Sequence, residues 1–228
     1  MATFLDLTNQ LLRRLNEVEI ASADFDAARG VQALAKDAIR NSIAKINQAE
    51  FTWPFNAAEH TATLAQGQEE YSWPTYFKVA DWDSFQIQAD SSLGVDYQHL
   101  EFIGRDYWYK RFRDADYNAG ASGIDVPRYV FPAHGNGFGV SPSPDKAYSI
   151  RFRYYIANVD LVTSTDIVLI PEAYNHVIVE GALYFMYMFR DNIEQANVAA
   201  QVFQQGLKEM QSILINKYTR MTDLRVRY

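Results

Sequence analysis

The stretch PEAYNHVIVEGALYFMYMFRD, residues 171–191, decides how this chain folds. Every residue from 181 to 189 is apolar, aromatic or glycine, and polar residues close the run on both sides. A membrane helix needs about 20 mostly apolar residues, so this run is too short to be one. A helix that is hydrophobic all round is otherwise a core helix, and Pro171 suits its first turn. We therefore predict a buried helix that needs cover on every side, from its own domain or from a neighbouring subunit.

Amphipathic helices are predicted towards both ends of the chain. Residues 3–18 repeat apolar side chains at three- and four-residue spacing, and residues 22–50 do so over a longer stretch, with Ser22 or Asp24 as the N-cap. After Asn192 the helical period continues through residues 194–218. The two ends therefore each carry a pair of helices.

The middle of the chain carries strand signals instead. Residues 60–65 and 69–73 alternate on either side of a glycine turn, and residues 148–156 alternate cleanly. Helices and strands segregate along the chain, which is typical of the α+β class. We predict an antiparallel helix bundle from residues 1–50 and 171–228, with an antiparallel β-rich module inserted at residues 51–170. The predicted bundle core consists of Leu11, Ile39, Val177, Gly181, Phe185, Met188, Phe203 and Met210.

The composition limits the function. The chain has 228 residues, of which 48% are hydrophobic and 21% charged, as expected for one or two globular domains. A formal net charge of −7 argues against a protein whose whole surface grips nucleic acid. The absence of cysteine excludes disulfides and thiolate-bound metals. Residues 1–12 lack the basic start and apolar core of a signal peptide.

No motif predicts a metal or a cofactor. The four histidines show no metal-ligand spacing, and the glycine-rich residues 134–139 precede prolines rather than a phosphate-binding helix. The acidic loop at 114–125 has ligand-like alternation, but Ala119 stands where a calcium loop needs glycine.

One catalytic alternative stays open. Two carboxylates held about 5–10 Å apart across a cleft can hydrolyse a glycosidic bond. The candidates are Glu69, Glu70, Asp81, Asp83 and Glu101.

The C-terminal residues 216–228 are basic, although the chain as a whole is acidic. This charge predicts an arm that binds an anionic partner, and the alternating LRVRY at 224–228 suits addition to the edge of another sheet. A frayed terminus is the alternative. The predicted binding residues are Lys217, Tyr218, Arg220, Leu224, Arg225, Val226, Arg227 and Tyr228.

Taken in order, several segments resemble bacteriophage head-to-tail adaptor proteins, also called connector or neck proteins. Residues 51–87 have that family's Trp-containing helix end, threonine-rich strand, Gly-Gln turn and tyrosine strand ending at a proline. The segments LEFIGRDYWYKRFRD at 100–114, PSPDKAYSIRFRYYIANVDL at 142–161 and IPEAYNHVIVEGALYFMY at 170–187 resemble the pieces that follow. The resemblance covers residues 46–210, and it rests on the order and spacing of these segments.

The resemblance implies a structural protein of the virion, made in the host cytoplasm, and not an enzyme. Such adaptors form a ring, of twelve subunits in short-tailed phages, under the portal protein. The ring joins the portal to the tail tube or nozzle, with a tail fibre as a further neighbour. It lines the channel through which the genomic DNA passes without specific binding, and no membrane is involved. The alternatives are a tail-associated cell-wall glycosidase and a receptor- or carbohydrate-binding tail module with an exposed aromatic platform.

Overall fold

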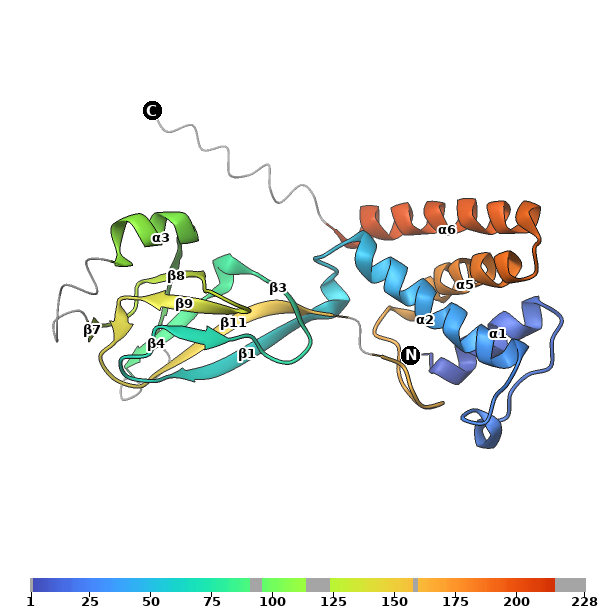
Figure 1. The fold of residues 1–228 in the computed structure, drawn as a ribbon, viewed down its shortest axis with the longest axis horizontal. Coiled ribbons are helices and arrows are strands. Elements are labelled where there is room, and N and C mark those ends of the chain that lie inside the picture. Colours follow the sequence, from blue (N-terminus) through green and yellow to red (C-terminus); the bar gives the residue numbers. More distant parts are fainter. Residues whose placement is uncertain (1, 91–95, 114–123, 158–159, 216–228) are drawn as a thin grey trace, which may run out of the picture. The chain divides into compact units, whose positions relative to one another are not determined.

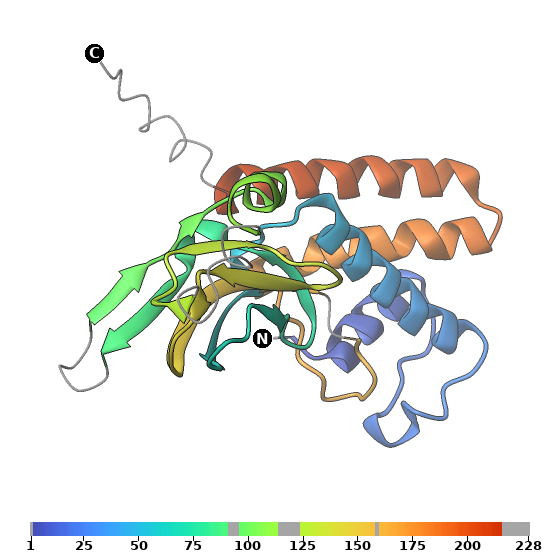
Figure 2. The ribbon, with the colours of Figure 1, turned by 60° about the vertical axis from the view of Figure 1, so that its left-hand side comes forward.

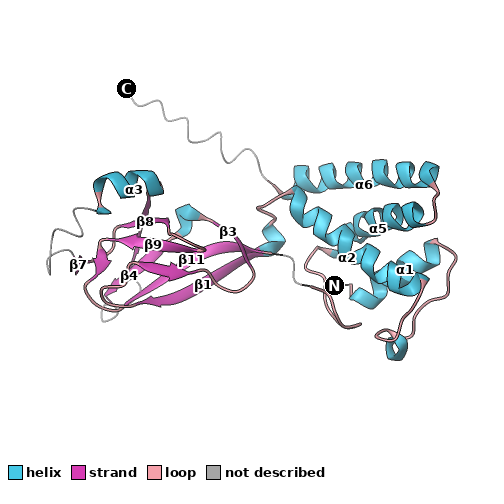
Figure 3. Ribbon diagram, in the orientation of Figure 1, coloured by secondary structure: helices cyan, strands magenta, loops and turns pink. Residues whose placement is uncertain are grey.

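The computed structural model describes residues 2–90, 96–113, 124–157 and 160–215. It has the mixed α+β composition that the sequence predicts (Figure 3). The chain divides into two compact units, which are described separately (Figure 1). The helical unit comprises Met1–Asn56 and Asn158–Tyr228, and the β unit comprises Ala57–Ala157. In the part of the chain that the structure describes, no helix has both the length and the apolar character to span a bilayer.

Helix α1 (Phe4–Arg14) begins at a capping box. The Thr3 hydroxyl accepts the Asp6 N–H at 3.1 Å, and the Asp6 carboxylate accepts the Thr3 N–H at 3.0 Å. The helix was predicted to run to residue 18, but it ends at Arg14. Just beyond, Asn16 adopts a left-handed backbone with a φ of 56°, which an α-helix cannot continue through.

Helix α2 (Val31–Ala49) begins later than predicted, so the assignment of Ser22 or Asp24 as its N-cap is wrong. Residues Ser22–Asp24 form a separate 3₁₀ turn, η1, and Gly30 precedes α2 with a φ of 57°. Glycine adopts this backbone without steric cost, so the chain turns there and α2 starts afterwards. After α2 the fully buried Trp53 donates its indole N–H to the Ile46 carbonyl at 2.8 Å, before the short turn η2 (Pro54–Asn56).

Helices α5 (Asn175–Phe189) and α6 (Ile193–Leu214) follow one another with a tight turn between them. A 3₁₀ turn, η5 (Glu172–Tyr174), leads into α5. Asp191 takes a φ of 56° in the connecting turn, and the Asn192 side chain caps α6 by accepting the Gln195 N–H at 3.3 Å. Helix α5 contacts α1, α2 and α6, so the stretch 171–191 lies at the centre of the helical unit.

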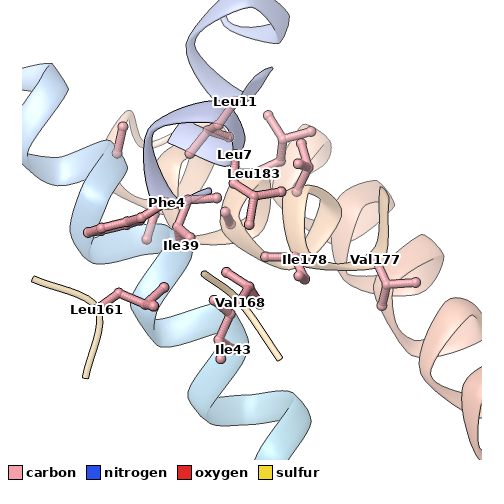
Figure 4. Close-up of a cluster of buried hydrophobic side chains, with 14 of the residues drawn as sticks. Phe4, Leu7, Leu11, Ile39, Ile43, Leu161, Val168, Val177, Ile178 and Leu183 are labelled. Atoms are coloured by element: carbon pink, nitrogen blue, oxygen red, sulfur yellow. The ribbon is translucent and has the colours of Figure 1, made fainter. Parts of the chain in front are cut away.

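We call residues 160–170 the return segment. The sequence places them in the β-rich module, 51–170, but they pack into the helical core. Leu161, Val168 and Ile170 are each at most 6% exposed, and Leu161 and Val168 lie beside Ile39 and Ile43 of α2 (Figure 4). A segment outside the named helices and strands is free to pack on either kind of neighbour, and here the helices bury it.

The β unit contains two main sheets. The first has the order β1 (Ala57–Leu64), β11 (Tyr148–Ile156), β4 (Gln86–Asp90), β5 (Asp96–His99), and β3 (Phe77–Ala80) also pairs with β11. The second has the order β2 (Glu70–Ser72), β9 (Gly137–Ser141), β8 (Tyr129–Pro132), β6 (Glu101–Phe102). Most pairs are antiparallel, as predicted, but β6 and β8 pair in parallel, as do β7 (Ile124–Asp125) and β10 (Ser143–Pro144).

Aromatic side chains fill the core that the two sheets share. Phe85 stacks on Phe152 with ring centroids 4.5 Å apart, and Trp73 stacks on Phe77 at 4.0 Å. The turn η3 (Trp82–Ser84) precedes β4, and the short helix α3 (Arg105–Arg111) follows β6. The high aromatic content of the chain therefore largely serves this core.

We expect Gly181→Ala to destabilise the helical unit by about 1–3 kcal/mol, the usual cost of overpacking a core. The added Cβ would lie 2.3 Å from Ser42 Oγ and 2.8 Å from the Phe203 ring. The Ser42 hydroxyl is held in place because it donates to the Ile178 carbonyl at 2.7 Å. Urea unfolding followed by helical circular dichroism measures the effect. Gly104→Ala is the matched control, since no atom lies within 4 Å of its added Cβ. Equal stabilities of the two variants would contradict this account of α5 packing.

Candidate assembly surfaces

One side of α5 is left uncovered within the helical unit. A groove of about 600 Å³ opens there between α2, α5 and α6. Its lining residues are Lys45, Gln48 and Ala49 of α2, Gly181, Tyr184 and Phe185 of α5, and Asn197, Ala200, Phe203, Gln204 and Leu207 of α6. Phe185 and Phe203 are half-buried, so the groove presents aromatic surface to whatever enters it.

Two glycines allow the three helices to approach closely at this groove. A Cβ at Gly206 of α6 would lie 2.8 Å from a methyl group of Val177 on α5, just as one at Gly181 would collide with Ser42 of α2. The short spacing brings α2 and α6 against α5 on either side of the groove.

The outward side of α6 carries no charge over residues 195–207. Val198 and Val202, one helical turn apart, are 56% and 43% exposed. The solvent side of a helix usually carries charged residues, whereas the cores of protein interfaces are depleted of them. This composition favours contact with another protein along α6.

A second apolar surface lies on the return segment. Its residues alternate, so that Val168 and Ile170 point into the helical core while Ile167 and Leu169 remain 56% and 41% exposed. Val162 is also exposed, at 60%. Residues 167–170 of the segment are thus apolar on both sides, and the helical unit covers only one of them.

Hydrogen bonds to its backbone carbonyls fix the return segment to helices α1 and α2. The N–H groups of Phe4 and Leu5, in the first turn of α1, have no acceptor within the helix. They donate to the carbonyls of Asp166 at 2.9 Å and Ser164 at 3.2 Å. The Arg40 Nε of α2 donates to the Leu161 carbonyl at 2.8 Å. The exposed side chains of the return segment are therefore presented from a firmly attached backbone.

A comparison with protein-family models gives a match. The model for the SU10 adaptor protein covers residues 2–227, which is nearly the whole chain. The chain belongs to the SU10 adaptor protein family. No curated protein matches the sequence.

Membership of the SU10 adaptor family confirms the resemblance to phage head-to-tail adaptors that the sequence suggested. The family is one of structural proteins of bacteriophages. It implies a component of the virion that interacts with the portal and tail proteins.

The predicted core residues of this SU10 adaptor lie in different environments. Leu11, Ile39, Val177, Gly181 and Met210 are buried, and Phe185 and Phe203 are half-buried at the groove. Met188 was predicted in the core and is instead 49% exposed. It lies in the last turn of α5, where the chain turns into α6 and neighbouring Phe189 is also exposed, at 61%.

The predicted C-terminal arm lies outside the described residues, which end at Ile215. This holds for every one of its predicted binding residues: Lys217, Tyr218, Arg220, Leu224, Arg225, Val226, Arg227 and Tyr228. Of the acidic loop at 114–125, only Ile124 and Asp125 are described, and the Asp125 carboxylate accepts the Val126 N–H at 2.8 Å.

The candidate carboxylates of the SU10 adaptor do not gather at one depression. A shallow polar hollow of about 300 Å³ in the β unit is lined by only one of the five, Asp83, together with Glu59, Arg151 and Arg153. Asp81 pairs with Arg153 at 2.9 Å, and Glu70 accepts the His134 N–H at 3.3 Å. Both carboxylates thus have local structural partners.

Helix α3 places aromatic and basic side chains together on the surface of the β unit. Tyr107 and Tyr109 are 50% and 46% exposed, and the guanidinium groups of Arg111 and Arg113 lie over their rings at 5.9 and 4.3 Å. Tyrosine and arginine are enriched where protein interfaces gain most of their energy.

Sequence reasoning did not find the groove, the uncharged side of α6 or the return segment. One signal was present in the sequence, because residues 195–207 contain no charged residue.

We expect Asp166→Ala to loosen the return segment. The Asp166 carboxylate accepts the Thr163 hydroxyl and the N–H groups of Thr163 at 2.8 Å and Val162 at 2.6 Å. Hydrogen–deuterium exchange should show protection of the Val162 and Thr163 amides reduced severalfold, with Ile43 in α2 as the unchanged control. Unchanged protection at Val162 and Thr163 would contradict this role for the carboxylate.

The same loop should respond to acid. Hydrogen bonds from the Thr163 hydroxyl, then from the Val162 and Thr163 amides, hold the pKa of Asp166 below its usual range. A lowered folded-state pKa contributes stability above the ordinary carboxyl pKa of about 3.9, and this contribution is lost as the pH falls through the folded-state value. Protection of the Val162 amide in the unaltered protein should therefore fall below about pH 4. In Asp166→Ala it should lack this dependence.

Proposed function

We propose that this protein forms a ring, of twelve subunits, between the portal and the tail tube or nozzle of a short-tailed phage. It acts by binding proteins and not by catalysis. The observation that carries the proposal is the family match over residues 2–227, joined to a helical unit with uncovered apolar surface. Large exposed apolar patches on a soluble domain mark sites of interaction, and a ring gives each subunit two neighbours to cover them.

In this proposal residues 1–50 and 171–228 act as an antiparallel helix bundle that faces the portal. The contacts of α5 with α1, α2 and α6 support such a bundle. The C-terminal arm, with Lys217, Arg220, Arg225 and Arg227 against the single acidic Asp223, reaches along the portal. Its positive charge suits an anionic portal surface.

The β-rich module carries the contacts with the tail in this proposal, and a tail fibre is a further neighbour. The exposed Tyr107 and Tyr109, each with an arginine over its ring, support a protein contact at α3.

The ring also lines the DNA channel. Attraction between phosphates and basic side chains is what holds DNA to a protein, so a channel wall with few such side chains lets DNA slide. The net charge of −7 supports a wall of this kind. Genomic DNA then passes without specific binding.

Truncation after Ile215 tests the role of the arm. The truncated protein should keep its fold, because the described core lies entirely before residue 216, and it should lose docking to the portal. Co-sedimentation with portal particles and electron microscopy of the pelleted complexes measure docking, and circular dichroism checks the fold. A charge-preserving variant, Arg225→Lys with Arg227→Lys, is the control and should dock. Normal docking of the truncated protein would refute the role of the arm, whereas a full-length protein that forms no ring at the portal would refute the proposed function itself.

A further inference from the structure

We infer that neighbouring subunits of the ring join by seating the exposed side of the return segment of one copy in the groove between α2, α5 and α6 of the next. This inference rests on the proposed ring, and it names the two surfaces that hold the ring together. The occupant of the groove is thus a second copy of this chain.

The two surfaces lie on opposite faces of α2. At 3.6 residues per turn, Lys45, Gln48 and Ala49, which line the groove, project from the side opposite to Ile43 and Asn47, which adjoin the return segment. Figures 1 and 2 agree, since in both views α6 lies at the top of the helical unit and the return segment lies below α2 and α5. Different patches on opposite faces cannot pair within a symmetric dimer, but they do pair head-to-tail, which is the arrangement of a ring.

Both surfaces present exposed or half-buried apolar side chains. Ile167 and Leu169 alternate with the buried Val168 and Ile170 and are 56% and 41% exposed, so both face away from the helical core. The groove offers the half-buried rings of Phe185 and Phe203 in a space of about 600 Å³. Apolar side chains of the neighbour would therefore replace water against these rings.

The charges are also complementary. Lys45 at the rim of the groove makes no ion pair with any residue that the structure describes. The return segment carries Asp160 and Asp166 and no basic residue, and exposed Asp160 likewise has no ion pair among the described residues. Residues 195–207 of α6 carry no charge, so none of them repels the acidic side chains of the return segment.

The return segment is already ordered within the single subunit. Its carbonyls accept hydrogen bonds from Phe4, Leu5 and Arg40. The amides of Val162 and Thr163 donate hydrogen bonds to the Asp166 carboxylate. A surface that is already ordered loses little conformational entropy on binding, which increases affinity.

Cysteine cross-linking tests the inference, because the chain contains no cysteine of its own. Two full-length variants, Ile167→Cys and Gln204→Cys, are mixed under conditions of ring formation and treated with a short bifunctional maleimide. A cross-linked dimer should form in the mixture and not from either variant alone. The double variant should give a ladder that ends at the size of the ring. Mixing Val18→Cys with Gln204→Cys is the control and should give no dimer, because Val18, although 78% exposed, belongs to neither surface.

A second variant keeps the test independent of linker geometry. Leu169→Glu should abolish ring formation, measured by electron microscopy and sedimentation, whereas Val18→Glu, the same kind of change at an exposed apolar residue outside both surfaces, should not. A ring that persists in Leu169→Glu without the Ile167–Gln204 cross-link would overturn the inference and leave the proposed function standing. A groove cysteine at 204 that is protected in the monomer, and becomes reactive after truncation at Ile215, would overturn it in favour of the chain's own arm. An unaltered protein that forms no ring on the portal would instead refute the proposed function.

Discussion

The burial of α5 is the constraint on which the rest of the helical unit depends. A helix with apolar side chains on nearly every side cannot remain in water, so each flanking element has to cover part of it. Gly181 and Gly206 let α2 and α6 approach closely, and α1 and the return segment complete the core around it. The cover is incomplete at the groove and at the last turn of α5, where Met188 and Phe189 are exposed. The groove is therefore a candidate surface for assembly.

Periodicity in the sequence was sufficient to predict the α+β class, and the order of its segments was sufficient to recognise the family. Helix boundaries were less predictable. The apolar pattern of α2 extends to residues before 31, so the sequence predicts an earlier start. The helix begins only after Gly30, because the backbone of Gly30 has a φ of 57° and is not helical. Met188 shows a second limit, because a run that is apolar on every side contains no information about which side faces outward.

The assembly surfaces were harder to predict, for a physical reason. Residues 167–170, IVLI, are apolar on both sides of an extended chain, and such a run fits a buried strand of a sheet as well as a strap across helices. Only tertiary contacts decide between these two arrangements. Here the α1 amides and the Arg40 side chain donate hydrogen bonds to the carbonyls of the return segment. The groove depends likewise on how closely three helices approach, which no local pattern specifies.

Placing both proposed surfaces on the helical unit has a further consequence for the ring. In the proposed ring, the angle between successive subunits is then set within the helical unit. A head-to-tail contact closes into a ring only when that angle divides a full turn, and otherwise it continues as a helical filament. The hydrogen bonds that hold the return segment to α1 and α2 restrict this angle. In the proposed ring, the attachment of the return segment therefore contributes to the geometry of closure as well as to the strength of the contact.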